Sequence, residues 1–301
     1  MKVTHLLTAY NKASFIRDAA VSMFAQTYTP LEILLSDHGS TDGTRQMLDY
    51  LAKSYNGPHT VRRLDCPHTE VRGMPGLNAH INWAMTQTDA DFLVHLSADD
   101  YDLAQRVELA VRAFEEHSPS MVLGGMYYVN EKREYLGENP WPQEDGWCKL
   151  EEMHPKFVGG STIQSWSREF YEKVGGLSGV GSPDVVLPFL ACLDRGAYYV
   201  HARAHAYRKV IGVENTGLES VYYAFPEGSK ERLQQEELIH FQVMAGHYTA
   251  LAKMEKLTLT PEVAVAAGQC LAQAILDRSA SWVNVRQKMT FEKVPPLPFK
   301  V

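Results

Sequence analysis

Three groups of chemically distinctive residues stand directly after apolar runs in the first hundred positions. Tyr10 follows the first run, Asp37 follows the second, and the pair Asp99-Asp100 follows a later one. A tyrosine ring can stack on a planar base, a lone carboxylate can accept a ring N–H, and paired carboxylates can hold Mg²⁺ or Mn²⁺. This set of residue types indicates a site for a nucleotide diphosphate.

Each of these features also has an ordinary structural explanation. Tyr10 can be a packing residue, the segment 37–44 can be a turn with a helix cap, and Asp99-Asp100 can begin a helix. Their occurrence at three strand ends favours a binding site. The sequence has no GxGxxG segment after the first run and no GxxxxGK[ST] loop, which disfavours a dinucleotide site and an ATP P-loop.

The elements that must position these residues alternate between strand and helix. Apolar runs predict strands at 3–9, 31–36, 60–64, 92–96, 121–129 and 197–203. Helical spacing of apolar residues predicts helices at 12–26, 44–55, 77–86 and 103–116. Such alternation predicts parallel βαβ units in a helix-covered sheet, whose strands carry ligand-binding residues at their carboxyl ends.

The second half of the chain changes in character. Short helices are expected at 170–174 and 184–194, an irregular segment at 137–160, and two long helices at 230–255 and 261–286. The predicted organisation is therefore an α/β domain over 1–216 and a helical C-terminal extension over 217–301. The extension is a candidate surface for a homo-oligomer, a cover for an acceptor site, or an enlargement of the core.

Composition narrows the class of protein. The chain has 301 residues, 45% hydrophobic and 22% charged, as in folded globular proteins. Its 29 Lys and Arg against 36 Asp and Glu give a net charge of −7, which disfavours nucleic acid as a partner. The four Cys lie apart without CxxC spacing, which favours reduced thiols and a cytoplasmic protein. No apolar run approaches the roughly 20 residues of a transmembrane helix.

The same motifs carry a resemblance to a known family. Tyr10-Asn11, the segment 37–44 and Ala98-Asp99-Asp100 together resemble the signature of family 2 inverting glycosyltransferases with a GT-A fold. The resemblance covers roughly residues 2–210. It implies a Rossmann-like, mixed but mainly parallel sheet flanked by helices. It also implies metal-dependent transfer of a sugar, with inversion, from a nucleotide-diphospho sugar to an acceptor hydroxyl, with a UDP-sugar as donor and Mn²⁺ or Mg²⁺ as cofactor.

The resemblance also implies roles for particular residues of the donor site. Thr8, Tyr10 and Asp37 would hold the base, and Asp99 would contact the metal. Three further candidates for contact with the donor come from matching segments: Asn11, Asn82 and Ser97. The chain departs from the family pattern at His38, Ile81, Ser97 and Pro183, where the family commonly has Asp, Arg, Asp and Glu.

Two further candidates lie late in the chain. Asp184 takes the Asp position of a segment that resembles the family's Glu-Asp, and it would be the base that removes the proton of the acceptor hydroxyl. Its structural alternative is a cap of the helix that follows. His205 would complete the metal shell, because some GT-A enzymes use a late His; its alternative is a packing histidine.

A second function remains open from the sequence. The departures at Ser97, Ile81 and Pro183 also fit a catalytically silent GT-A-like module that binds a nucleotide sugar or acts as a scaffold. Turnover of a nucleotide sugar in the presence of metal would distinguish the enzyme from the silent module.

Overall fold

One large mixed sheet forms the centre of the molecule. The computed structural model describes residues 1–138, 144–150, 161–179, 181–209, 226 and 229–288. Within these residues the strand order is β3-β2-β1-β4-β9-β6-β10-β5, with β7 added to β6 and β8 added to β10. Pairing is parallel between β3, β2, β1 and β4 and between β6 and β10, and the remaining strands run antiparallel. This is the predicted fold class.

The strands have the following bounds: β1 Val3–Ala9, β2 Glu32–Asp37, β3 Thr60–Asp65, β4 Phe92–Ser97, β5 Tyr101–Asp102, β6 Met121–Val129, β7 Tyr135–Glu138, β8 Gly146–Trp147, β9 Gln164–Ser167 and β10 Ala197–Arg208. Every residue of β1 is buried, and β2 and β4 are buried almost throughout. Continuous apolar runs give such strands because helices cover both faces of the sheet.

The helices have the following bounds: α1 Ile16–Phe24, α2 Thr44–Ser54, α3 Gly73–Met85, α4 Arg106–His117, α5 Arg168–Lys173, α6 Pro183–Leu193, α8 Lys230–Lys253 and α9 Pro261–Lys288. Two 3₁₀ turns, η2 Ser161–Ile163 and η3 Met254–Lys256, complete the described elements. In α1 the buried residues recur at helical spacing, at Ile16, Ala19, Ala20 and Met23.

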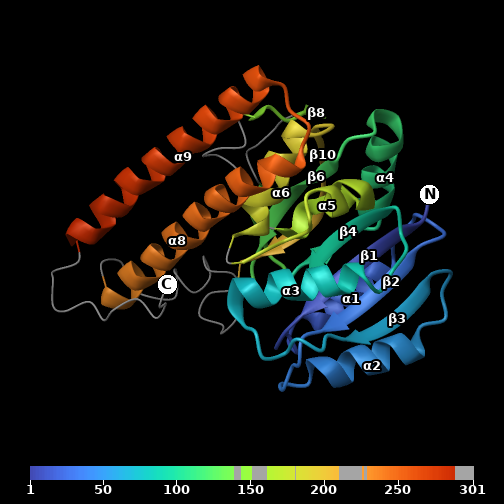
Figure 1. Ribbon diagram of the computed structural model, residues 1–301. Helices are drawn as coiled ribbons and strands as arrows, with labels where there is room; N and C mark the ends of the chain where they lie inside the picture. The colour runs from blue at the N-terminus through green and yellow to red at the C-terminus, as the bar shows by residue number, and fades with distance from the viewer. Residues whose placement is uncertain (139–143, 151–160, 180, 210–225, 227–228, 289–301) are drawn as a thin grey trace.

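Two hydrophobic cores lie on opposite faces of the sheet. One joins α1, α2 and α4 to β1, β2 and β4, with Ile16, Leu48 and Val107 among its members. The other joins α3, α5 and α6 to β6, β9 and β10, with Trp166 and Phe170 fully enclosed. The sheet is therefore the middle of three layers, with α3 drawn in front of it (Figure 1).

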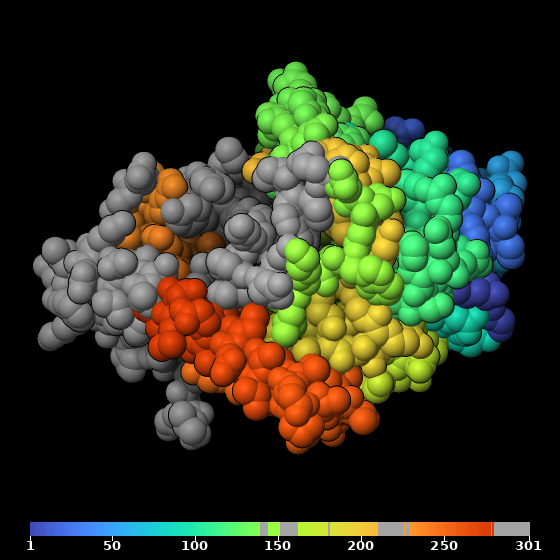
Figure 2. Space-filling view, turned by 90° about the horizontal axis from the view of Figure 1, so that it is seen from above, coloured from blue at the N-terminus to red at the C-terminus, as the bar shows by residue number. Residues whose placement is uncertain are grey.

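The two long C-terminal helices form a layer of their own. Figure 1 shows α8 and α9 beside α6, on the side of the molecule away from α2 and β3. Seen from above, their orange and red surfaces border the yellow region around α6 (Figure 2). A small core of Phe189, Ala250, Ala267 and Leu271 joins α6, α8 and α9. The predicted boundary at 216/217 lies outside the described residues and stays a prediction.

The remaining expectations about elements agree with the structure in part. The strands predicted at 3–9 and 121–129 match β1 and β6, whereas β10 is five residues longer than predicted. The short strands β5, β7, β8 and β9 were not predicted. Most of the segment predicted to be irregular, 137–160, lies outside the described residues. None of the helices in the described ranges is both long and apolar enough to cross a bilayer.

Candidate functional site

The ends of β1, β2 and β4 bring the three predicted groups to one edge of the sheet. The register pairs Ala9 with Asp37 and Thr8 with Ser97. Just beyond the strands, the amide of His38 donates to the carbonyl of Ala9 at 2.8 Å. Because the three strands are direct neighbours, the residues at and just after their ends lie at one carboxyl edge of the sheet, where α/β proteins bind ligands.

Asp37 combines full burial with a free acceptor. Its side chain is 0% exposed, and its Oδ2 accepts hydrogen bonds from the amides of Gly39 at 3.0 Å and Ser40 at 2.9 Å. Its Oδ1 is buried and has no hydrogen-bond donor among the described residues. A buried acceptor without a donor costs about 1–3 kcal/mol. A ring N–H of a bound base would satisfy this oxygen.

Tyr10 has a cation over one face of its ring. The Arg72 guanidinium carbon lies 4.3 Å from the centroid of the Tyr10 ring, and Arg72 also donates to the carbonyl of His38 at 3.2 Å. The ring of His38 meets Tyr10 edge-on at 6.1 Å. The Arg72 guanidinium therefore covers one face of the Tyr10 ring, and the 4.3 Å separation leaves no room for a base between them.

Asn11 ties the first strand end to the loop after β2. It has a positive φ of 49°, and its amide donates to Ser40 Oγ at 2.9 Å while its Oδ1 accepts from the amide of Thr41 at 2.9 Å. These bonds hold the end of β1 to the loop that carries Asp37. Its predicted contact with the donor stays a prediction.

Thr8 belongs to a buried polar layer beneath the predicted base site. Its hydroxyl is hydrogen-bonded to His95 Nε2 at 3.0 Å. Next to it, His80 Nε2 is hydrogen-bonded to Ser36 Oγ at 2.7 Å, and the His80 ring stacks on His38 at 5.0 Å. Burial, with smaller contributions from His38 and His95, lowers the pKa of His80 to about 3. The His80 imidazole in this layer is therefore neutral near pH 7.

Asp99 is the carboxylate just after β4 that faces a lysine. Its side chain is 17% exposed, and its Oδ2 lies 3.6 Å from the ammonium of Lys12. Burial and the neighbouring Asp100 raise the pKa of Asp99, and Lys12 opposes this shift. Ser97, two residues earlier at the end of β4, donates its amide to Thr162 Oγ1 at 3.2 Å and is half-buried.

His205 lies in a buried network with carboxylates. Its Nδ1 donates to Asp102 Oδ1 at 2.7 Å, and its Nε2 lies 3.4 Å from Asp100 Oδ2. Burial opposes protonation of His205, but hydrogen bonds to Asp100 and Asp102 raise its pKa to about 9. Both ring nitrogens therefore face carboxylates. His205 as a metal ligand stays a prediction.

Asp184 is the second residue of α6, and its approach loop is held by side-chain amides. Asn78 donates to the carbonyls of Gly179 at 3.1 Å and Gly181 at 3.0 Å. Gln164 donates to the carbonyl of Pro183 at 3.3 Å. Because Gln164 follows closely on Thr162, which contacts Ser97, this hydrogen bond connects the start of α6 to the end of β4.

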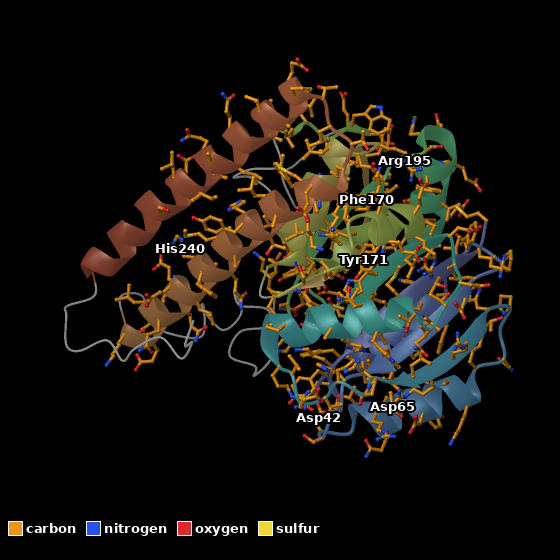
Figure 3. The ribbon with its side chains drawn as sticks, viewed as in Figure 1. Asp42, Asp65, Phe170, Tyr171, Arg195 and His240 are labelled. Atoms are coloured by element: carbon orange, nitrogen blue, oxygen red, sulfur yellow. The ribbon has the colours of Figure 1, made fainter. Side chains whose placement is uncertain are left out.

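Asn82 is engaged with the same loop. Its Nδ2 donates to the carbonyl of Leu177 at 2.7 Å, and its Oδ1 accepts from the amide of Leu177 at 3.0 Å and from the hydroxyl of Tyr171 at 2.6 Å. Figure 3 shows Tyr171 on α5, directly above α3. These bonds fix the loop rather than leaving the amide open to a ligand, and the predicted contact of Asn82 with the donor stays a prediction.

Sequence reasoning missed several residues that the structure places at the site. Lys12 directly follows Tyr10-Asn11, so its position after a strand end was an available signal. Arg72 stands before a helix and gave no comparable signal. Gln164 lies in a polar segment whose pairing with distant strands is not visible in the sequence.

The fold and the site together define a GT-A-type α/β protein. The family model described as Glycosyl transferase family 2 matches residues 5–164, just over half of the 301 residues. The chain belongs to this family.

Curated relatives match over part of their length. The putative glycosyltransferase EpsE of Bacillus subtilis (strain 168) is 29% identical over 132 residues, which is 43% of this chain and 45% of that protein. The chondroitin synthase of Pasteurella multocida (strain Pm70) is 30% identical over 112 residues, 37% of this chain and 11% of that protein. The matches span less than half the length of these relatives.

Solved structures share the fold over nearly the whole chain. S. aureus TarS 1-349 in complex with UDP-GlcNAc aligns with a TM-score of 0.59 and 14% identity, covering 96% of this chain and 88% of that one. The mannosyltransferase PcManGT from Pyrobaculum calidifontis, in complex with GDP-Man and Mn²⁺, aligns with a TM-score of 0.55 and 18% identity, covering 95% and 84%. These likenesses support the GT-A fold.

Proposed function

We propose that this chain is a metal-dependent inverting glycosyltransferase that moves a sugar from a UDP-sugar to an acceptor hydroxyl. One observation carries the proposal. Tyr10, Asp37 and Asp99 follow three neighbouring strands and lie at one edge of the sheet, where Asp37 keeps a buried oxygen without a described donor. Membership of the glycosyl transferase family 2 supports the same class of activity.

The base would stack on the Tyr10 ring; because the Arg72 guanidinium carbon lies only 4.3 Å from the ring centroid, a base on that face would have to displace it. The ring N–H of the base would donate to Asp37 Oδ1, the acceptor that the described residues leave without a partner. Thr8 and the buried histidines beneath it would support this site. Uracil and guanine both present a ring N–H, and the two structural neighbours were solved with UDP-GlcNAc and GDP-Man. We assign uracil, and GDP is the competitor that a binding assay must include.

The residues at the end of β4 fit a divalent cation that the diphosphate helps to hold. Mg²⁺ and Mn²⁺ often bind through one or two carboxylates together with substrate phosphates. The described residues contain no group of three or more His, Cys, Asp or Glu able to hold a metal alone. Asp99 would be the ligand from the protein. His205, the second residue predicted for the metal shell, would first have to give up one of its two carboxylate partners and a proton. When bound, the cation would supply stabilisation of the charge on the leaving diphosphate.

Asp184 would act as the base. Its carboxylate would take the proton of the acceptor hydroxyl while that oxygen forms a bond to the anomeric carbon. The bond from this carbon to the diphosphate oxygen would break on the opposite face, so the configuration inverts and the nucleotide diphosphate leaves. The amides of Asn78 and Gln164 hold the backbone just before this residue, at Gly181 and Pro183, which would keep the carboxylate in place.

The test separates binding from transfer. We expect Asp184→Asn to bind UDP with Mn²⁺ as the wild type does and to lose about 10²–10⁴-fold in transfer, the usual contribution of a general base. Isothermal titration calorimetry measures the binding, and release of UDP from UDP-sugars measures turnover. Asp277→Asn, an exposed position on α9, is the matched control.

Two outcomes would contradict the assignment. Full activity of Asp184→Asn would remove Asp184 as the base. Binding of UDP without turnover of any UDP- or GDP-sugar by the wild type would favour the silent module, which the uncharged Ser97 and the Pro183 beside Asp184 also fit.

A further inference from the structure

Lys12 is a buried cation aimed at the end of β4. Its side chain is 7% exposed, and its ammonium lies 3.6 Å from Asp99 Oδ2. Its backbone is fixed on both sides, because its amide donates to Thr44 Oγ1 at 2.7 Å and its carbonyl accepts from the amides of Phe15 and Ile16 at 2.9 and 2.8 Å. The backbone of Lys12 is therefore fixed at the junction between β1 and α1.

Asp99 is the carboxylate for which two cations would compete. At Ser97 the chain supplies a hydroxyl in place of a charge. Asp100 already accepts the amide of Arg208 at 2.7 Å with Oδ1, while its Oδ2 faces His205. Asp99 is 17% exposed, against 3% for Asp100, and has the ammonium of Lys12 as its neighbour, so a divalent cation placed on Asp99 would meet that ammonium at close range.

We propose that Lys12 exchanges partners when the donor binds. Without donor, its ammonium neutralises Asp99; with metal on Asp99 and a nucleotide diphosphate in the crevice, the ammonium binds a phosphate oxygen of the donor. The inference rests on the proposed function and adds a diphosphate-binding residue to it. A lysine suits the exchange because its charge is compact and its stem is flexible, so a small rotation moves the ammonium between two oxygens.

The exchange makes predictions of opposite sign for metal and nucleotide. In Lys12→Met, Mn²⁺ alone should bind about tenfold more tightly, because the positive charge of Lys12, which repels the metal ion, is removed. UDP at saturating Mn²⁺ should bind about tenfold more weakly, because the ammonium that would bind a phosphate oxygen is missing. Lys12→Arg keeps the charge and should hold Mn²⁺ affinity within about threefold of the wild type. Lys173→Met is the control: it removes a lysine that pairs with Asp194 at 2.5 Å outside the site, and neither affinity should change.

Free Mn²⁺ measured by electron paramagnetic resonance gives the metal affinity, and calorimetry with UDP gives the nucleotide affinity. In an Asp99→Asn background, Lys12→Met should no longer change the affinity for Mn²⁺, because the competition is for that carboxylate. Circular dichroism melting confirms that each variant is folded. If Lys12→Met destabilises the chain, Lys12→Gln repeats the comparison with a neutral polar side chain.

The possible failures are distinct. Unchanged affinities in Lys12→Met, or a loss of both, would overturn the exchange and leave Lys12 as a structural ion pair. Failure of the wild type to bind UDP and GDP with Mn²⁺ would instead overturn the proposed function. The affinity for Mn²⁺ alone would then still report whether Lys12 competes for Asp99.

Discussion

Asp37 is the residue on which the donor proposal depends most directly. In Asp37→Asn, the amide oxygen can still accept from Gly39 and Ser40, so the loop should keep its structure. The amide NH₂ would then stand where Oδ1 now lies and would face the ring N–H of the base, donor against donor. We expect UDP affinity to fall by about 10–100-fold, the cost of about 1–3 kcal/mol for an unmade buried hydrogen bond.

Calorimetry with UDP and Mn²⁺ measures this loss. Asp277→Asn makes the same chemical change at an exposed position on α9, away from the site, and should leave UDP affinity unchanged. Equal UDP affinity in Asp37→Asn and the wild type would show that Asp37 is a structural residue of the turn.

His80 gives a pH dependence of stability with a definite sign. Its pKa is lowered from 6.5 to about 3 by burial, so the unfolded chain takes up a proton that the folded chain refuses. Stability is therefore fully present above pH 6.5 and is lost as the pH falls toward 3, with a slope of about 1.4 kcal/mol per pH unit from this residue. The free energy of unfolding, measured with urea between pH 6.5 and 4.5, should depend less steeply on pH in His80→Gln. The difference in slope should correspond to about one proton. Equal slopes would contradict the burial of a neutral imidazole.

At the scale of elements, α3 acts as a clamp on the loop that leads to α6. Asn82 makes three hydrogen bonds to Leu177 and Tyr171, and Gly176 lies so close that an added Cβ would stand 2.6 Å from Asn82 Oδ1. With a φ of +63°, Gly176 also needs the conformational freedom of glycine. We expect Asn82→Ala to lower the free energy of unfolding by about 1–3 kcal/mol.

The same variant tests whether the clamp positions Asp184. Transfer should fall while UDP binding is retained, because β1, β2 and β4 build the donor side without the clamp. Gln87→Ala, which removes an exposed amide just after α3, is the control and should change neither property. A loss of UDP affinity as large as the loss of transfer would favour the predicted contact of Asn82 with the donor.

The elements differ in how far their sequence could predict them. β1 and β6 were predicted because long apolar runs are what strands covered on both faces require. β9 was missed because Gln164, Ser165 and Ser167 are buried polar residues, and their pairing with β4 and β6 depends on contacts distant in sequence. The same difference applies to the site: Tyr10, Asp37 and Asp99 follow predictable strands, whereas Asn78 and Gln164 act through tertiary hydrogen bonds that no local pattern reveals.

At the scale of the whole molecule, α8 braces the start of α6. Gly246 of α8 packs so closely that an added Cβ would lie 3.0 Å from the Cβ of Val185, the residue after Asp184. Lys253 near the end of α8 donates to the carbonyl of Val174 at 2.8 Å, which ties the same helix to the loop that α3 clamps. The C-terminal layer therefore contacts the acceptor side of the proposed site, and His240, near the middle of α8, lies far from Asp42 in Figure 3.

This packing predicts that the C-terminal layer controls transfer without controlling donor binding. Gly246→Leu should force α8 from α6 and cost about 1–3 kcal/mol through overpacking. The melting temperature and the transfer rate should both fall, and UDP affinity at a temperature where the variant is folded should match the wild type. Gly268→Ala on α9 is the matched control, because its added Cβ meets nothing within 4 Å and should stabilise the helix by up to about 1 kcal/mol. Unchanged melting and transfer in Gly246→Leu would mean that α8 is independent of α6, and the helical extension would then act apart from the site.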